Sequence, residues 1–163
     1  MSPLCSVCRQ ADTRFFFQDG SAVYWRCPVC EATCLDAAHL PAPDAEYARY
    51  LEHDNTPQDT GYRRFLEKLA TPLLDRLPPG QQGLDYGCGP GPVLAMLLRE
   101  AGHGVRTFDP FFAPEPEVLH DTYDFITCTE VIEHFHQPYD EFAFLNKLLN
   151  PGGILGIMTC FQT

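Results

Sequence analysis

Hydrophobic and polar positions follow two different patterns along this chain. Residues 13–17 and 22–26 are short strand-like runs, joined by Gln18-Asp19-Gly20-Ser21. Asp-Gly between two such runs is a hairpin signal, so the pattern predicts two antiparallel strands. From residue 83 onward, short apolar runs alternate with amphipathic segments, which is typical of a parallel sheet with crossover helices. The chain therefore divides into a small antiparallel part and a larger α/β part.

The α/β part, residues 81–163, has a regular series of expected elements. Strands are expected at 83–86, 105–108, about 118–120, 123–129 and 154–159, with helices at 92–101 and 139–149. Pro110, Pro114 and Pro116 interrupt the segment after the second strand, and proline inside a helix removes a hydrogen bond. We therefore expect a loop there in place of a crossover helix.

A helical segment, residues 41–80, is expected to join this part to an N-terminal module of residues 1–40. Its two helices are expected at 44–51, capped by Asp44, and from about 56 to 76, capped by Thr56 or Asp59. Pro72 is expected to kink the second helix or to restart it, with Thr71 as the new cap. Five side chains of this segment are candidates for a ligand pocket or for the core: Tyr47, Tyr50, His53, Gln58 and Tyr62.

Composition and charge exclude some classes of function. The 163 residues are 45% hydrophobic and carry a formal net charge of −11, which argues against a surface that tracks nucleic-acid phosphates. No apolar run approaches the roughly 18 residues of a membrane span. The N-terminus lacks the basic and then apolar segment of a secretory signal, so a cytoplasmic location and no membrane partner are expected.

Eight cysteines without a signal peptide indicate metal ligands and buried thiols in preference to disulfides. Two Cys-x-x-Cys pairs, separated by eighteen residues, predict a tetrahedral zinc site in a zinc ribbon. Four thiolates close such a site, so the ion is expected to be structural, with Cys34 and His39 as spare candidates. The expected ligands are Cys5, Cys8, Cys27 and Cys30.

The stretch Gly83 to Gly91 carries the strongest indication of function. A short strand leads through Asp85 into Gly87, Gly89 and Gly91 and then into a helix, a pattern that fits either a tight strand–helix turn or a loop under a ligand. Pro92 stands where a dinucleotide-binding fingerprint needs its third glycine. The remaining Asp-x-Gly-x-Gly-x-Gly resembles the first motif of class I S-adenosylmethionine methyltransferases, in which this loop passes under the methionine end of the cofactor.

Three further segments support this resemblance in the order that the family has them. Asp109 ends the second strand, 24 positions after Asp85, where an acid can bond both ribose hydroxyls. Glu130-Val131-Ile132-Glu133-His134 resembles the family's Glu-Val-x-Glu-His segment, and Asn150-Pro151-Gly152-Gly153 its Lys-Pro-Gly-Gly turn. The resemblance implies a Rossmann-like parallel sheet with flanking helices. The family's sheet has two more strands after the fifth, so we expect a chain truncated after that strand, with an exposed edge open to self-association.

The resemblance also assigns residues to roles. The cofactor-binding residues expected are Asp85, Tyr86, Gly87, Cys88, Gly89, Gly91, Asp109, Pro110, Thr129 and Glu130. If residues 130–134 begin a helix, Glu130, Glu133 and His134 share one face. That face could hold a second cation or leave His134, with Glu133, for general acid–base catalysis; the alternative is a helix start with acids placed for the helix dipole.

The expected reaction is transfer of the S-adenosylmethionine methyl group to an oxygen, nitrogen or carbon atom of a small-molecule acceptor. Two alternatives stay open at this point. The first is a nucleic-acid methyltransferase whose zinc module grips RNA or DNA, which the net charge of −11 disfavours. The second is a non-catalytic adaptor that binds S-adenosylmethionine, or nothing, while its zinc ribbon recruits a protein.

Overall fold

The computed structural model describes residues 2–51 and 56–159, and its contacts divide the chain into two compact units. The first consists of Met1–Glu46 with Phe135–Phe144, and the second of Tyr47–His134 with Leu145–Thr163. This division differs from the three segments expected from the sequence, because much of the predicted helical joining segment belongs to the second unit. His53 lies outside the described residues.

The first unit contains a three-stranded antiparallel sheet in the order β1-β2-β3. Its strands are β1 (Arg14–Asp19), β2 (Ala22–Arg26) and β3 (Thr33–Leu35). The predicted hairpin is confirmed, although its two-residue loop is Gly20-Ser21, one position later than expected, with Gly20 at a φ of +55°. Strand β3 was not predicted; it pairs with β2 through Cys34 opposite Trp25. A 3₁₀ turn, η1 (Ala37–His39), follows it.

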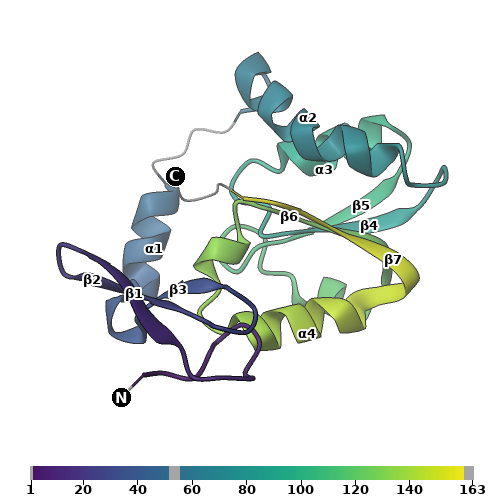
Figure 1. The fold of residues 1–163 in the computed structure, drawn as a ribbon. Helices are drawn as coiled ribbons and strands as arrows, with labels where there is room; N and C mark the ends of the chain where they lie inside the picture. Colours follow the sequence, from purple (N-terminus) through teal and green to yellow (C-terminus); the bar gives the residue numbers. More distant parts are fainter. Residues whose placement is uncertain (1, 52–55, 160–163) are drawn as a thin grey trace. The chain divides into compact units, whose positions relative to one another are not determined.

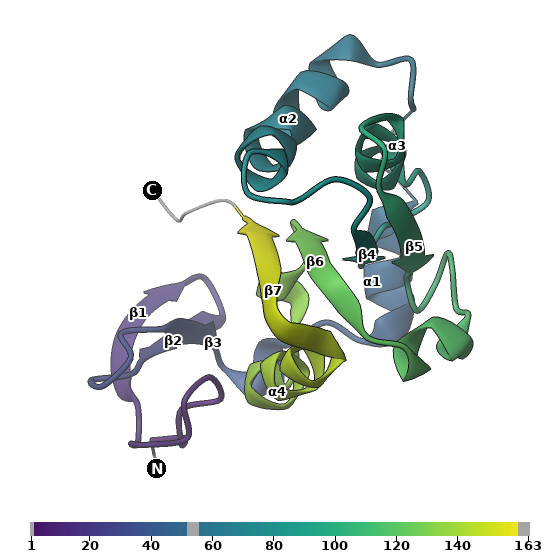
Figure 2. The same ribbon diagram turned by 90° about the vertical axis from the view of Figure 1, so that its right-hand side faces the viewer.

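The second unit is built on a parallel four-stranded sheet in the order β5-β4-β6-β7 (Figures 1 and 2). Its strands are β4 (Gln82–Tyr86), β5 (Gly104–Phe108), β6 (Tyr123–Thr129) and β7 (Leu149–Met158). All pairings between these strands are parallel, which confirms the α/β class. Among the described residues β7 has a neighbour only on its β6 side.

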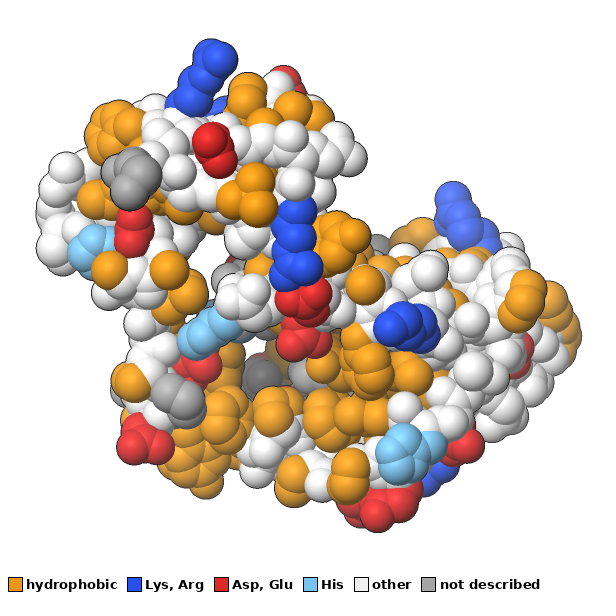
Figure 3. All heavy atoms as spheres, turned by 90° about the horizontal axis from the view of Figure 1, so that it is seen from below, with side chains coloured by type: hydrophobic (Ala, Val, Ile, Leu, Met, Phe, Trp, Pro, Cys, Tyr) orange, Lys and Arg blue, Asp and Glu red, His pale blue; other side chains and the backbone are white. Residues whose placement is uncertain are grey.

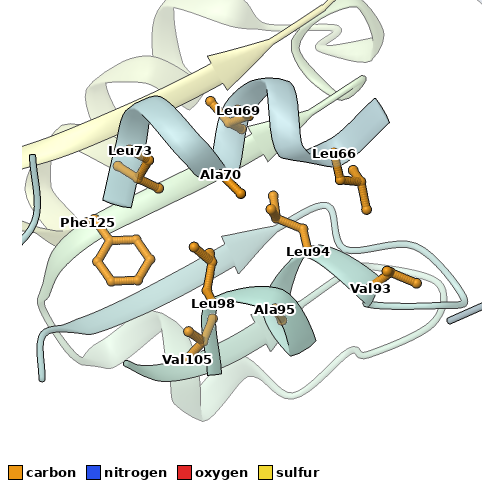
Figure 4. Packing of buried hydrophobic residues seen from close by; sticks show 10 residues of the cluster. All are labelled: Leu66, Leu69, Ala70, Leu73, Val93, Leu94, Ala95, Leu98, Val105 and Phe125. Carbon is orange, nitrogen blue, oxygen red and sulfur yellow. The ribbon is translucent and has the colours of Figure 1, made fainter. Parts of the chain in front are cut away.

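Helices α2 (Thr60–Leu74) and α3 (Val93–Glu100) lie on the same face of this sheet (Figure 1). Their apolar stripes meet the sheet in a core of ten buried side chains (Figure 4). Phe125 is fully buried and packs so closely on β4 that a Cβ at Gly83 would lie 2.1 Å from its ring. The ten are Leu66, Leu69, Ala70, Leu73, Val93, Leu94, Ala95, Leu98, Val105 and Phe125.

Helix ends follow the expected caps only in part. Asp59 caps α2, its carboxylate accepting the Gly61 and Tyr62 N–H groups at 2.8 and 3.1 Å. Of the two effects expected at Pro72, a kink or a restart, the restart with Thr71 as cap is wrong, because Pro72 falls in the last turn and α2 continues to Leu74. The remaining helices are α1 (Pro43–Tyr50) and α4 (Pro138–Leu148), so Asp44 lies inside the first turn of α1 and does not precede it.

The segment between β5 and β6 has no α-helix, as its prolines predicted. The strand expected at about 118–120 is wrong: residues there form the 3₁₀ helix η2 (Pro116–His120). Val118 is buried, and its carbonyl accepts a hydrogen bond from the buried Tyr123 hydroxyl at 2.6 Å. The crossover from β5 to β6 is therefore short and irregular.

Candidate functional site

The glycine turn after β4 is shaped by two residues with left-handed backbone. Gly87 and Gly89 have φ values of +75° and +66°, conformations that are costly for residues with a Cβ. At Gly87 a Cβ would lie 2.5 Å from Val131, so close packing also requires glycine there. At Gly89 a Cβ would meet no atom within 4 Å. The turn is therefore packed on one side at Gly87 and open at Gly89.

Asp109 fastens this turn to the loop after β5. The carboxylate is 7% exposed, and its Oδ2 accepts the Gly89 N–H at 3.0 Å. Its Oδ1 accepts the Phe111 and Phe112 N–H groups at 2.8 and 3.1 Å. The sequence placed Asp109 beside the glycine turn, and the structure brings the two together. The bonds from residues 111 and 112 were not foreseen.

Asp85 is buried beneath the same turn. Its carboxylate is 3% exposed and accepts a hydrogen bond from the Thr127 hydroxyl at 2.8 Å. Burial raises the pKa of Asp85 from 3.8 to about 6, against the lowering effect of the Thr127 hydroxyl. Burial also raises the pKa of the neighbouring Cys88 to about 12, so this thiol stays protonated near neutrality. The Tyr86 ring stacks on Phe108 at 5.4 Å.

The end of β6 contributes two oxygens that lack partners. Thr129 Oγ1 and Glu130 Oε1 are buried and have no hydrogen-bond partner among the described residues. Glu130 has a φ of +52°, held by a 2.7 Å bond from its N–H to the Met158 carbonyl. Buried polar atoms are nearly always bonded, and strained backbone is concentrated at functional sites. These two oxygens therefore fit a ligand that brings N–H or O–H donors to this edge.

Four cysteines of the first unit form the one group of metal-ligating side chains found in the part of the chain described. The sulfur atoms of Cys5, Cys8, Cys27 and Cys30 all lie within 4.8 Å of one another. Two of their separations, Cys5 to Cys30 and Cys8 to Cys27, are 3.7 Å. A tetrahedral Zn²⁺ with Zn–S bonds of about 2.3 Å places its sulfurs about 3.8 Å apart. The spacing fits zinc.

The two Cys-x-x-Cys loops have the same backbone geometry. In each, the residue after the second cysteine donates its N–H to the carbonyl of the first, from Arg9 to Cys5 and from Glu31 to Cys27, both at 3.1 Å. Arg9 and Glu31 have φ values of +54° and +61°, positions that favour glycine. Backbone N–H groups from the second loop lower the pKa of Cys27 to about 6, which favours the thiolate that a metal binds.

The spare candidates lie outside the cysteine cluster. Cys34 accepts a hydrogen bond from the Ser6 hydroxyl at 3.4 Å, and burial raises its pKa. His39 is exposed at the end of η1. Neither belongs to the group of four sulfurs.

Comparison with known proteins agrees with this geometry. Residues 50–163 match the model of a family described as a methyltransferase domain. The chain belongs to this methyltransferase family. It is also similar to the mitochondrial ubiquinone biosynthesis O-methyltransferase of Schizosaccharomyces pombe, with 28% identity over 109 residues. The match spans 52% of this chain and 39% of that relative, so the chain covers well under two thirds of it.

In this member of the methyltransferase family, the segment after β6 differs from the helix that the sequence suggested. Only Ile132–His134 form a turn of 3₁₀ helix, η3, and Glu130 stands outside it with its positive φ. Glu130, Glu133 and His134 therefore do not share a helical face, and they are not among the metal-ligating groups of the described residues. His134 is exposed, and its ring contacts the Tyr50 ring edge-to-face at 5.4 Å.

Three residues of the site escaped the sequence analysis. Val131 fills the space beside Gly87, while Phe111 and Phe112 donate to Asp109. The two phenylalanines directly after Asp109-Pro110 were the available signal, since aromatic residues in a proline-rich loop have no helical face through which to be buried and must pack elsewhere.

Across the described chain, no helix combines the length and apolar character that crossing a bilayer requires.

Proposed function

We propose that the protein is an S-adenosylmethionine-dependent methyltransferase that acts on a small-molecule acceptor. The observation that carries this proposal is the 3.0 Å hydrogen bond from Gly89 to the Asp109 carboxylate. It joins the glycine turn after β4 to the buried acid after β5, at the sheet edge where open α/β folds bind ligands. Membership of the methyltransferase family supports the same cofactor.

The residues that would hold the cofactor come from the ends of three strands. The carboxylate of Asp109 has about four acceptor positions, of which three backbone N–H groups use three, leaving one for a ribose hydroxyl. Thr129 and Glu130 offer the two unpartnered oxygens. The full set is Asp85, Tyr86, Gly87, Cys88, Gly89, Gly91, Asp109, Pro110, Thr129 and Glu130.

The chain's own residues then have a limited chemical task. When bound, S-adenosylmethionine supplies a methyl group on a sulfonium, which is already a good leaving group. The protein has to align an acceptor and keep water away, and alignment alone contributes much of such an acceleration. We assign His134, with Glu133 beside it in the sequence, to general acid–base catalysis, with the His134 imidazole as the base that takes the acceptor's proton.

Charge supports a small molecule over a nucleic acid as the acceptor. The net charge is −11, and on the face that Figure 3 shows lysine and arginine side chains stand apart from one another. A surface that follows phosphates needs a continuous basic stripe. An oxygen as the methylated atom is supported by the similarity to an enzyme named as an O-methyltransferase.

Titration calorimetry with S-adenosylmethionine tests the proposal through a matched pair of glycines. Gly89 and Gly80 have positive φ values, +66° and +74°, and a Cβ at either would meet nothing within 4 Å. Gly89→Ala and Gly80→Ala should therefore carry the same backbone strain, but only the first places a methyl group in the proposed site. We expect native binding with a Kd below about 100 µM, at least tenfold weaker in Gly89→Ala and unchanged in Gly80→Ala. Absence of native binding at about 1 mM ligand, or equal weakening by both variants, overturns it.

A further inference from the structure

Five rings from three separate segments meet in the second unit, and we call them the aromatic cluster: Tyr47, Tyr50, Phe111, Phe112 and His134. Tyr47 contacts both Phe111 and Phe112, with ring centroids 5.5 and 5.7 Å apart. Tyr50 contacts Phe111 at 5.9 Å and His134 at 5.4 Å. Tyr47 remains 41% exposed, so the cluster presents aromatic surface to solvent.

Two chains of contacts connect the aromatic cluster to the glycine turn. On one side, the Asp109 carboxylate takes the Phe111 N–H on one oxygen and the Gly89 N–H on the other. On the other side, the His134 N–H donates to the Val131 carbonyl at 2.9 Å, and Val131 packs against Gly87. One residue, Asp109, connects the cluster to the turn on the first side, and one residue, Val131, connects them on the second. An acceptor held by it would be close to the proposed cofactor site.

The side chains of this region restrict which acceptor can bind. Faces and edges of four carbocyclic rings favour a planar aromatic ligand, which pairs with them in stacked or edge-to-face geometry. The turn and the segments beside the cluster carry four acidic side chains, Asp85, Asp109, Glu130 and Glu133, against one basic side chain on α1, Arg49. A phosphate or carboxylate on the ligand would meet repulsion there, and the cluster itself contains no lysine or arginine to pair with it. His134 adds a group that can hydrogen-bond a hydroxyl.

Resting on the proposed function, we propose that the aromatic cluster is the acceptor site and that its ligand is an uncharged aromatic compound bearing a hydroxyl group. The ligand ring packs on the exposed side of Tyr47, whose other contacts are Phe111 and Phe112, and His134, held by Tyr50, bonds its hydroxyl.

Ligand-detected NMR on the full chain tests this with two probes, catechol and trans-cyclohexane-1,2-diol, which share adjacent hydroxyls but differ in the ring. Both are titrated with and without S-adenosylhomocysteine, whose own affinity is measured by calorimetry. We expect catechol to bind at least tenfold more tightly than the saturated diol. Tyr47→Leu should weaken catechol binding about three- to tenfold and leave the affinity for S-adenosylhomocysteine within twofold.

Tyr139→Leu is the matched control, since Tyr139 is 42% exposed and lies in the first unit. It should change neither affinity. Phe112→Leu provides a second variant should Tyr47→Leu lower the thermal midpoint. Equal binding of the two probes, or equal effects of Tyr47→Leu and Tyr139→Leu, overturns the acceptor site. Failure of S-adenosylhomocysteine to bind overturns the proposed cofactor instead, and the catechol titration without it then reports on the cluster alone.

Discussion

Replacing Asp109 by asparagine separates its binding role from its structural one. An asparagine side chain has nearly the same shape, but only one of its two terminal atoms accepts hydrogen bonds. With its oxygen toward Phe111 and Phe112, its NH₂ group faces the Gly89 N–H, 3.0 Å away in the native protein, and donor meets donor. One charge-assisted bond is lost and one buried donor is left without a partner.

The size of the effect follows from these contacts. A hydrogen bond to a charged group contributes about 1.5–3 kcal/mol, so Asp109→Asn should lower the free energy of unfolding by about that amount. If the remaining acceptor position of the carboxylate takes a ribose hydroxyl, the same range applies to binding. The affinity for S-adenosylhomocysteine should then fall about 10- to 150-fold.

Titration calorimetry and urea unfolding measure the two quantities independently. Asp121→Asn is the matched control, because Asp121 is an exposed acid that pairs with Arg106 at 2.6 Å, and such pairs contribute about 1 kcal/mol or less. It should leave ligand affinity unchanged. If Asp109→Asn is destabilised but binds S-adenosylhomocysteine within twofold of the native protein, the carboxylate only organises its own loop, and the ribose assignment is refuted.

Three further predictions concern other parts of the chain. Removing metal with a chelator should shift the fluorescence emission of Trp25, the single tryptophan, to longer wavelength, because the metal cross-links the N-terminal module. Cys27→Ser should cause the same shift without chelator. Cys34→Ser should keep one zinc per chain by atomic absorption, and loss of zinc from this variant would contradict the four-sulfur site. Glu31→Gly should raise the free energy of unfolding by about 0.5–1 kcal/mol by relieving a φ of +61°, a gain that Glu31→Ala, which keeps the strain, should not give. Asp85→Asn should stabilise the protein near pH 7 and not near pH 4. Folding raises the pKa of Asp85 from 3.8 to about 6, so it costs about 3 kcal/mol once the carboxyl is ionised in both the folded and the unfolded state. Urea unfolding measures the difference between variant and native protein, and a difference that does not change with pH would contradict the burial argument.

Local patterns in the sequence predicted most of the sheet. Strand β6 matches its predicted bounds, 123–129, because the residues from Phe125 to Cys128 are buried on both faces of the sheet and three of these four are apolar. Strand β3 has three residues, too few for a period to be read, and it forms only because β2 offers it an edge. The strand expected near residue 118 was wrong for a related reason: the segment is also short, and it buries Val118 from a 3₁₀ helix.

The sequence predicted that the glycine turn and Asp109 lie together, but it did not predict the contacts around them. The spacing of the glycines and the acid after the second strand of the parallel sheet were enough to predict that Gly89 and Asp109 lie close together. The contact of Val131 with Gly87 could not be predicted from the sequence, because it joins segments more than 40 residues apart. The positive φ of Glu130 could not be predicted either, because it depends on the hydrogen bond to Met158 in a neighbouring strand. Such tertiary constraints leave no local periodicity.

Helix α4 limits how this protein can be taken apart. It begins in the first unit, where the Tyr139 N–H donates to the Ser6 carbonyl at 3.1 Å and Asp140 pairs with Arg9, and its last residues belong to the second unit. A fragment cut after residue 46 would leave the cysteine-rich module without its contacts to Tyr139 and Asp140, and the remaining piece would carry an α4 that lacks the same contacts. Grafting this module onto another protein, or exchanging it for a different one, thus means transferring residues 135–144 as well.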